Sequence, residues 1–449
     1  MLPDLLPIRP FTRPVEGTVV LPGSKSLTNR ALALAALTRQ QVRLTGALFS
    51  DDTRVMAEAL RRLGLPVEED ASGRTLTLQG VGGEWPVAEA ELYYGNAGTA
   101  ARFLTALLAL RAGGCYTLDG NAAMRKRPMR GLFEALTHLG AAEVAYLGAP
   151  GFFPVRLRTH GFPAGAWPVD ASASSQILSA LLMAAPLAPG SVRLKLLGET
   201  VSRPFVQMTL HCMAQFGQTQ PMLEANHANT FTFVPHAYRL AGATYPVEPD
   251  ATAASYFLAL PWVVGGSLTL PGFAGVRQQG DRAFADILVP LGVRVEELSS
   301  RHARVSLGER GRAGGRFDFN PISDTFLTLA ALAPLLESPL TIHGIAHTRH
   351  QETDRIGAMA AELRKLGQKV DETDDSLTIE PDPAAVRKRS AHGPIEIDTY
   401  EDHRIAMSFG ILGCFDLHGD GRPWIALRDP GCCAKTFPDF FQRLEDLRG

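Results

Sequence analysis

The sequence has 449 residues, of which 45% are hydrophobic, and its formal net charge is −2. This length predicts two domains with sizeable cores, and the near-neutral charge excludes a general attraction to nucleic acid or to an anionic membrane. No apolar run is long enough to suggest a membrane span, and residues 1–14 are too short and too rich in proline for a signal peptide. Five cysteines without CxxC spacing favour a reduced, cytoplasmic protein.

Six segments share one outline, in which hydroxyl or charged residues precede an apolar run rich in small residues. Each predicts a helix that is apolar nearly all round and is therefore buried. The segments recur at intervals of roughly 70–80 residues, which is longer than the common solenoid periods. In chain order, these helical segments are residues 23–37, 95–110, 170–186, 250–264, 323–336 and 401–413.

A strand, a loop and a second helix follow these segments. The strands alternate apolar and polar residues and end in glycine or aspartate, which is typical of a strand followed by a turn. With their loops they cover residues 42–52, 116–128, 192–204, 268–280, 340–354 and 425–437. The second helices are amphipathic, which predicts an outer position, and each ends in a glycine that can cap it. They cover residues 54–64, 129–140, 205–217, 284–292 and 354–367.

The repeats predict an α/β (α+β) protein with two domains of three units each. A boundary near residue 240 divides the six units equally, and the first strand, near residue 7, is expected to join the C-terminal half. The expected N-terminal domain is therefore 22–241, and the expected C-terminal domain combines 1–21 with 242–449.

The stretch LPGSKSLTNRALALAAL, residues 21–37, indicates an anion site, because hydroxyls and a lysine precede a helix N-terminus. It is not a nucleotide P-loop, since Ser24 and Val19 occupy the two positions where that motif requires glycine. A serine cap beside a solvated Lys25 would explain part of the pattern. Arg30 favours a functional interpretation, because an unpaired charge inside an apolar helix is costly to bury.

Further polar residues lie at the starts of the buried helices or in the loops after the strands. They are Arg125, Lys126, Arg127, Arg130, Ser172, Ser174, Ser175, Gln176, Asp324, His347, His350, Glu352, Asp354, Arg355, Asp402, His403, Arg404 and Lys435. Some of these residues also have structural explanations. A run of charges such as Arg125–Arg127 is usually solvated, and Glu352 and Arg355 have the spacing of a salt bridge on one helix face. Asp324, taken alone, suits a helix cap. Three serines at one helix start exceed what a cap needs and suit a phosphate. The whole set predicts a site for more than one anionic group.

Cofactor sites are not indicated. The histidines lack HExxH spacing and no cysteine pattern accompanies them, so we expect no metal. No Gly-x-Gly-x-x-Gly motif opens a βαβ unit, so we expect no dinucleotide.

Seven motifs occur in one order, namely PGSKSLTNRAL, GNAGTAARF, RKRP, DASASSQ, ETDRI, YEDHRIAM and CAKTFPDFF. In this combination, essentially the whole chain resembles the 5-enolpyruvylshikimate-3-phosphate synthase family of enolpyruvyl transferases. The resemblance implies two domains, each of three βαβαββ-type repeats with buried helices and outer sheets, and an active site in the cleft between them. It also implies transfer of the enolpyruvyl group of phosphoenolpyruvate to the 5-hydroxyl of shikimate 3-phosphate. The family releases phosphate by addition and elimination, uses no cofactor, and serves chorismate and aromatic amino acid biosynthesis.

The resemblance further implies roles for individual residues. Asp324 would take the hydroxyl proton, Glu352 would exchange a proton with the methylene carbon, and Lys25 would assist proton transfer. Phosphoenolpyruvate, mainly on the C-terminal domain, would bind Lys25, Asn96, Gly98, Arg127, Gln176, Arg355, Arg404 and Lys435. Shikimate 3-phosphate, mainly on the N-terminal domain, would bind Ser26, Arg30, Ser174, Ser175, Gln176, Ser202 and Asp324.

The sequence departs from the family pattern at five positions. Phe103, Phe205, His347, Gln351 and Gly431 stand where proline, tyrosine, asparagine, lysine and lysine are frequent. Phe205 and Gln351 remove contacts to the shikimate substrate. Because Gly98 is retained, glyphosate is expected to fit beside the phosphoenolpyruvate subsite and to inhibit.

Two alternatives stay open. One is an enolpyruvyl transferase for another acceptor, such as UDP-N-acetylglucosamine, although such enzymes usually have Lys-Asn where this chain has Lys25-Ser26. The other is a non-catalytic anion-binding homologue, against which Asp324, Glu352 and Lys25 argue. We expect a cytoplasmic monomer with small-molecule substrates and without nucleic-acid or membrane partners.

Overall fold

The computed structural model describes residues 2–172, 174–198, 202–218, 222–223, 229–309 and 311–448. The chain divides into two compact units. Unit 1 contains Met1–Pro22 and Glu248–Gly449, and unit 2 contains Gly23–Val247. Each unit has a hydrophobic core of its own. The chain therefore passes from unit 1 to unit 2 and back again.

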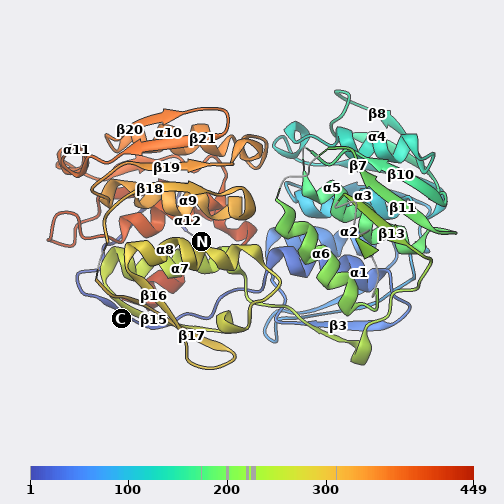
Figure 1. Cartoon of the computed structure of the whole chain (residues 1–449), viewed down its shortest axis with the longest axis horizontal. Helices are drawn as coiled ribbons and strands as arrows, with labels where there is room; N and C mark the ends of the chain where they lie inside the picture. The colour runs from blue at the N-terminus through green and yellow to red at the C-terminus, as the bar shows by residue number, and fades with distance from the viewer. Residues whose placement is uncertain are drawn as a thin grey trace. The chain divides into compact units, whose positions relative to one another are not determined.

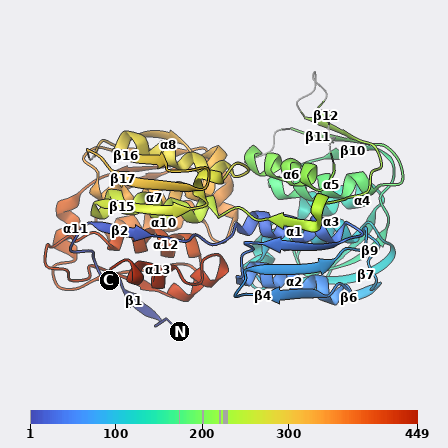
Figure 2. The same ribbon diagram turned by 90° about the horizontal axis from the view of Figure 1, so that it is seen from below.

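At each point where the chain passes between the units, the strand before the crossing stays in a sheet of one unit while the helix that follows it belongs to the other unit. Strand β2 (Val15–Thr18) precedes unit 2 in the sequence but pairs in parallel with β15 (Gly266–Pro271) of unit 1, where Figure 2 shows it in blue beside that strand. Strand β14 (Thr244–Pro246) pairs in parallel with β3 (Gln41–Thr45) of unit 2. Residues 242–247 thus belong to unit 2 and Pro22 to unit 1, so the expected boundaries at 241 and 22 move to 247 and 23.

Three four-stranded sheets of unit 2 share one strand order among the residues described there. In each sheet the first and second strands are parallel, and the fourth and third strands complete the sheet in antiparallel pairing. The first sheet is β14–β3–β5 (Thr75–Gln79)–β4 (Val67–Asp70). The second is β6 (Glu89–Tyr93)–β7 (Ala112–Asp119)–β9 (Val155–His160)–β8 (Ala142–Tyr146). The third is β10 (Gly165–Val169)–β11 (Val192–Leu196)–β13 (Thr230–Phe233)–β12 (Met222–Leu223).

Unit 1 follows the same scheme. One sheet is β2–β15–β17 (His302–Leu307)–β16 (Val293–Glu297). Another is β18 (Gly315–Asp318)–β19 (Leu340–His343)–β21 (Ser376–Glu380)–β20 (Lys369–Glu372). The last sheet has three strands within the part of the chain that the structure describes, and they are β22 (Ile395–Ile397), β23 (Ile425–Arg428) and β1 (Leu5–Pro7).

The predicted apolar helices form and are buried, because alanine and leucine on all faces leave no side suited to water. They are α1 (Lys25–Ala36), α3 (Gly98–Leu108), α5 (Ser175–Ala184), α7 (Ala251–Val264), α9 (Phe326–Leu332) and α12 (His403–Gly413). In unit 1, α7, α9 and α12 contact one another inside the layers of sheet (Figure 1). In unit 2, α3 contacts both α1 and α5.

The amphipathic helices cover these units with their polar faces outward. They are α2 (Asp51–Arg62), α4 (Arg130–His138), α6 (Arg203–Gln215), α8 (Phe284–Leu288), α10 (Arg355–Lys365) and α13 (Phe440–Asp446), and a further helix, α11 (Pro383–Arg389), follows β21. The expected glycines end them in the left-handed conformation, as at Gly64 with φ 91° and Gly367 with φ 90°. The alternation of a buried and an amphipathic helix is therefore confirmed.

Gly266 offers a test of the pairing between β2 and β15. Its φ is 91°, and a Cβ atom there would lie 2.0 Å from the Val15 carbonyl oxygen of β2. Gly266→Ala should lower the free energy of unfolding by more than about 2 kcal/mol, because it combines a strained φ with a clash between strands. Gly113→Ala is the matched control, since its φ is 77° and a Cβ there meets nothing within 4 Å. Equal losses in urea unfolding of the two variants would mean that the β2–β15 contact is unimportant.

Candidate functional site

A buried arginine joins several elements of unit 1. Arg355, the first residue of α10, is 1% exposed. Its Nε donates to Asp402 Oδ2 at 2.7 Å, its Nη2 to Glu352 Oε2 at 2.8 Å, and its Nη1 to Asp324 Oδ1 at 3.0 Å. Burial alone would lower the pKa of Arg355, but these three carboxylates raise that pKa above its ordinary value. Arg355 is therefore a fixed cation.

Two further cations complete what we call the Arg355 cluster, which consists of Asp324, Glu352, Arg355, Asp402, Arg404 and Lys435. Arg404 Nη2 donates to Asp324 Oδ2 at 2.7 Å. Lys435, at the end of the 3-10 helix η10 (Pro430–Lys435), places its Nζ 3.4 Å from Glu352 Oε1. Asp324 and Glu352 thus each lie between two cations. Within the cluster, three positive and three negative side chains balance.

Local structure around the two carboxylates differs from the sequence prediction. Asp324 is not a helix cap, because it lies inside the 3-10 helix η7 (Asn320–Thr325), and α9 begins only at Phe326 with Thr325 as its cap residue. Glu352 does not share a helix face with Arg355, because it precedes α10, whose cap is Asp354. The pairing of Glu352 with Arg355 nevertheless forms.

A further acidic residue beside this cluster was missed by sequence reasoning. Asp281, in the 3-10 helix η5 (Gly280–Ala283), is 5% exposed and accepts a hydrogen bond from Thr252 Oγ1. Burial and the nearby charge of Asp324 raise the pKa of Asp281 to about 7, although the Thr252 hydrogen bond and Arg404 oppose this. Asp281 is therefore an acid that can hold a proton near neutral pH.

In unit 2, Arg30 of α1 is 2% exposed and bonds to uncharged groups. Its Nε donates to Thr209 Oγ1 at 2.8 Å, and its other nitrogens donate to Ser179 Oγ and to the carbonyl oxygens of Ser26 and Phe205. No carboxylate pairs with it among the residues that the structure describes. Burial therefore lowers the pKa of Arg30 to about 10, which leaves it a cation at neutral pH.

Two of the unusual phenylalanines lie beside Arg30. The Arg30 guanidinium carbon is 5.2 Å from the centre of the Phe103 ring and 6.0 Å from that of Phe205. Such distances suit cation–π contacts, which stabilise a buried guanidinium without a counter-ion. The two departures from the family pattern thus support the arginine that the sequence singled out.

A second group in unit 2 surrounds the start of α3. Arg127, which follows the 3-10 helix η1 (Met124–Lys126), donates from Nη1 to both Asn96 O and Asn96 Oδ1 at 3.2 Å. Arg102 Nη1 donates to Gly98 O at 3.2 Å and to Gln176 Oε1 at 3.3 Å. A Cβ at Gly98 would lie 2.7 Å from Arg127 Nη2 and 2.8 Å from Arg102 Nη1, so a side chain there would displace both guanidinium groups. Arg102 was missed, although it shows the same signal as Arg30, a charge within an apolar helix.

Several of the remaining predicted residues of unit 2 lie at helix starts. Lys25 opens α1 and its Nζ lies 3.4 Å from Asp52 Oδ2, a partner that sequence reasoning did not identify. Ser174 caps α5, and Ser175 is the first residue of that helix. Ser202 precedes α6 with φ 53° and is 5% exposed. The hydroxyls of these three serines, at or beside helix N-termini, are donors of the kind that bind phosphate.

The other departures in unit 1 also have observable contacts. His347 Nε2 lies 2.8 Å from Ser323 Oγ, next to Asp324 in the chain. Gln351 accepts a hydrogen bond from Arg355 Nη1. Nothing in the structure explains Gly431.

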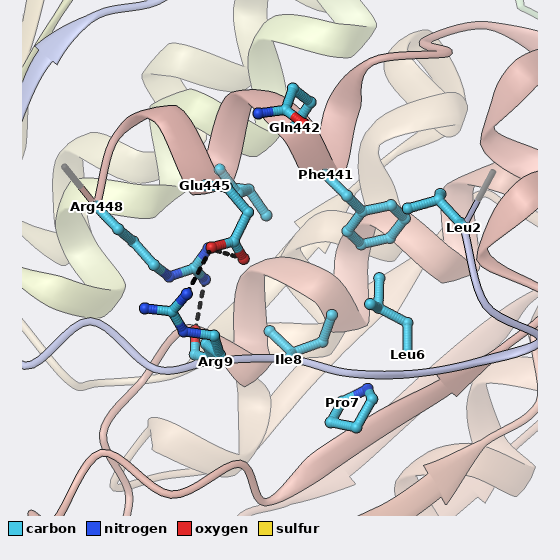
Figure 3. A pocket seen from close by; sticks show the side chains of 10 residues that line it. Leu2, Leu6, Pro7, Ile8, Arg9, Phe441, Gln442, Glu445 and Arg448 are labelled. Carbon is cyan, nitrogen blue, oxygen red and sulfur yellow. Dashed lines mark hydrogen bonds and ion pairs between the residues drawn. The ribbon is translucent and has the colours of Figure 1, made fainter.

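A separate cavity of about 90 Å³ lies between β1 and α13 of unit 1 (Figure 3). Its lining includes Leu6, Phe441 and an ion pair between Arg9 and Glu445 at 3.1 Å. Sites for organic ligands usually exceed about 300 Å³, and none of its lining residues belongs to the Arg355 cluster. Among the described residues, no group of acidic, histidine and cysteine side chains gathers as metal ligands, and no helix is both long and apolar enough to cross a membrane.

Comparisons with solved structures define the class of fold. An EPSP synthase from Acinetobacter baumannii matches with a TM-score of 0.75 and 25% identity, covering 99% of this chain and 98% of that chain. The enolpyruvyl transferase NikO from Streptomyces tendae matches with a TM-score of 0.73, covering 99% of this chain and 97% of that one, and its 20% identity supports the fold alone. The fold is that of the enolpyruvyl transferases.

Sequence comparisons then give the family. The model of EPSP synthase (3-phosphoshikimate 1-carboxyvinyltransferase) matches residues 11–444. A 3-phosphoshikimate 1-carboxyvinyltransferase of Opitutus terrae is 53% identical over 100% of this chain and 98% of its own length. A chloroplastic relative from Brassica napus is 40% identical over 97% of this chain and 84% of its own length. The chain belongs to the EPSP synthase family, which confirms the predicted fold class, enzyme class and reaction and favours them over another acceptor.

The raised pKa of Asp281 predicts a pH-dependent stability. An unfolded aspartate titrates near pKa 3.9, so between about pH 4 and 7 the native state holds up to about one proton more than the unfolded state. The free energy of unfolding should therefore fall as the pH rises through this window. Asp281→Asn should flatten the fall, measured by urea unfolding at several pH values, whereas Asp371→Asn, an exposed control, should not. An unchanged pH slope in Asp281→Asn would contradict the assignment.

Proposed function

We propose that the charged residues of both units together carry out the family reaction. In that reaction the enolpyruvyl group of phosphoenolpyruvate moves to the 5-hydroxyl of shikimate 3-phosphate and phosphate is released. The observation that supports these roles is the position of Asp324 and Glu352, each held between two buried cations. An anionic substrate that forms ion pairs with some of these cations would replace the carboxylates as their partners and so leave the carboxylates available for proton transfer.

Phosphoenolpyruvate is proposed to bind mainly through unit 1. Its carboxylate and phosphate suit the planar guanidinium groups of Arg355 and Arg404, which can form paired hydrogen bonds, and the ammonium group of Lys435. From unit 2, Lys25 and Arg127 would add positive charge, and Asn96, Gly98 and Gln176 belong to or contact the Arg102–Arg127 group. These cations would stabilise the negative charge that moves onto the leaving phosphate.

The acid–base steps are assigned to the two central carboxylates. In the addition step, the 5-hydroxyl oxygen bonds to C2 of phosphoenolpyruvate, its proton passes to Asp324, and the methylene carbon takes a proton from Glu352 in its acid form. In the elimination step, a methyl proton returns to Glu352, the double bond forms again, and the bond from carbon to the phosphate oxygen breaks. The leaving phosphate takes the hydroxyl proton from Asp324, so both carboxyl groups return to their starting protonation states. Lys25 would assist the proton transfers.

Shikimate 3-phosphate is proposed to bind mainly through unit 2. The hydroxyls of Ser174, Ser175 and Ser202 and the helix starts they mark would hold its phosphate. Ser26 and Gln176 would hold the rest of the molecule. Arg30 bonds to the Ser26 carbonyl oxygen and lacks a carboxylate among the described residues, so an anionic substrate would supply its missing counter-charge.

We further propose that the chain acts as a cytoplasmic monomer. All the residues assigned to the reaction come from one chain, so no partner subunit is needed to complete the set. Its cysteines are free in the structure, which suits a reducing compartment.

Acceptor identity is tested most directly by phosphate release. With phosphoenolpyruvate present, the purified chain should release phosphate when shikimate 3-phosphate is added and should remain at background with UDP-N-acetylglucosamine. The reason is that the serine-rich helix starts suit a single phosphate monoester. Release with the nucleotide sugar alone would contradict the proposed substrate.

Removal of either carboxylate should abolish most turnover without unfolding the chain. Asp324→Ala and Glu352→Ala should each reduce kcat by about 10²-fold or more, because a general acid or base is lost. Asp371→Ala, an exposed aspartate on β20, is the matched control and should retain wild-type kcat. Phosphate release at near-normal rates by both active-site variants, with circular dichroism confirming their fold, would disprove the assigned roles.

A further inference from the structure

A strained turn immediately precedes the Arg355-cluster residues of α12. The Asp402 N–H donates to Thr399 O at 2.8 Å, which closes a four-residue turn. Its central residues, Tyr400 and Glu401, both have φ 56°. Two consecutive positive φ values define a type I′ turn, which normally uses asparagine or glycine because other side chains are unfavourable there. Neither central residue here is of that kind, so other contacts must hold the turn.

Glu362 of α10 supplies those contacts from a buried position. It is 0% exposed, and its Oε1 accepts the Tyr400 hydroxyl at 2.6 Å while its Oε2 accepts the Asp398 N–H at 3.2 Å. Lys365 Nζ balances both acids, lying 2.8 Å from Glu362 Oε2 and 2.6 Å from Asp398 Oδ2. One carboxylate thus binds the chain before the turn and the side chain at its centre.

The same helix also holds the residue that follows the turn. Arg355 and Glu362 are seven residues apart on α10 and so lie on one face. Arg355 binds the Asp402 side chain, and Asp402 caps α12 by accepting the Arg404 N–H at 2.9 Å. α10 therefore contacts this segment on both sides of the turn, through Glu362 at Asp398 and through Arg355 at Asp402.

We propose that Glu362 and Tyr400 are positioning residues for Arg404. Together they hold the unfavourable turn that sets where α12 begins and hence where Arg404 points. Neither residue needs to touch the substrate. The proposal rests on the proposed binding of phosphoenolpyruvate by Arg404.

Steady-state kinetics of Tyr400→Phe provide the test, because this variant removes one hydroxyl and keeps the ring. The KM for phosphoenolpyruvate should rise about 3- to 10-fold, while the KM for shikimate 3-phosphate should stay within about twofold. Glu362→Gln should give the same pattern, and the double variant should be less than additive since both act through one contact. Tyr146→Phe, at a tyrosine of similar exposure (38% against 40%), is the matched control and should leave both KM values unchanged.

A rescue variant separates positioning from general stability. Tyr400→Phe/Glu401→Gly should recover at least half of the lost affinity for phosphoenolpyruvate, because glycine adopts positive φ without strain. An unchanged KM in Tyr400→Phe, or an equal rise in both KM values without rescue, would overturn the positioning role. Arg404→Gln separates the positioning role of Tyr400 from the binding role of Arg404. If it raises the phosphoenolpyruvate KM while Tyr400→Phe does not, the positioning role alone fails; if it has no effect, the proposed binding role of Arg404 fails as well.

Discussion

The burial of the Arg355 guanidinium is the constraint on which the rest of the predicted site in unit 1 depends. A charge that is 1% exposed is tolerated only when counter-charges and hydrogen bonds replace water. Asp324, Glu352 and Asp402 provide them from η7, from the loop before α10 and from the cap of α12. Ion pairs with Arg355 therefore bring these three segments together. The same ion pairs position Asp324 and Glu352, the two carboxylates assigned to proton transfer.

The two units balance charge in different ways. In unit 1 the cations of the Arg355 cluster pair with carboxylates, so a substrate anion there must compete with them. In unit 2, Arg30 donates to hydroxyls and backbone carbonyl oxygens, and no carboxylate pairs with it among the described residues. Competition between the substrate anion and the carboxylates for the same cations suits a site of proton transfer, because the carboxylates must leave their ion pairs before they can accept or donate protons. The positive charge of Arg30, which uncharged partners hold in place, suits a subsite that binds an anion without proton transfer.

The repeated architecture explains why several of these residues lie at or near the starts of helices, as Lys25, Ser175 and Arg355 do. Each repeat places a buried helix after a leading strand, and an all-apolar helix cannot be covered by one sheet alone. Three repeats per unit solve this by packing their helices together, as α7, α9 and α12 do. The helix N-termini then offer unpaired N–H groups at equivalent points of each repeat. Strand β2 makes unit 1 depend on a segment that is separated in the sequence from its main span, whereas β14 is the last strand of the continuous unit 2.

The sequence by itself determined the repeats, the buried and outer helices, the family and the residue types of the site. This was possible because helix periodicity, glycine caps and ordered motifs are local signals. Only the tertiary structure decided which cations Asp324 and Asp402 meet, that Asp324 lies in a 3-10 segment, and that Asp52 and Asp281 join the predicted residues. It also decided that Phe103 and Phe205 flank Arg30. These contacts join segments far apart in the chain, so no local pattern of residues encodes them.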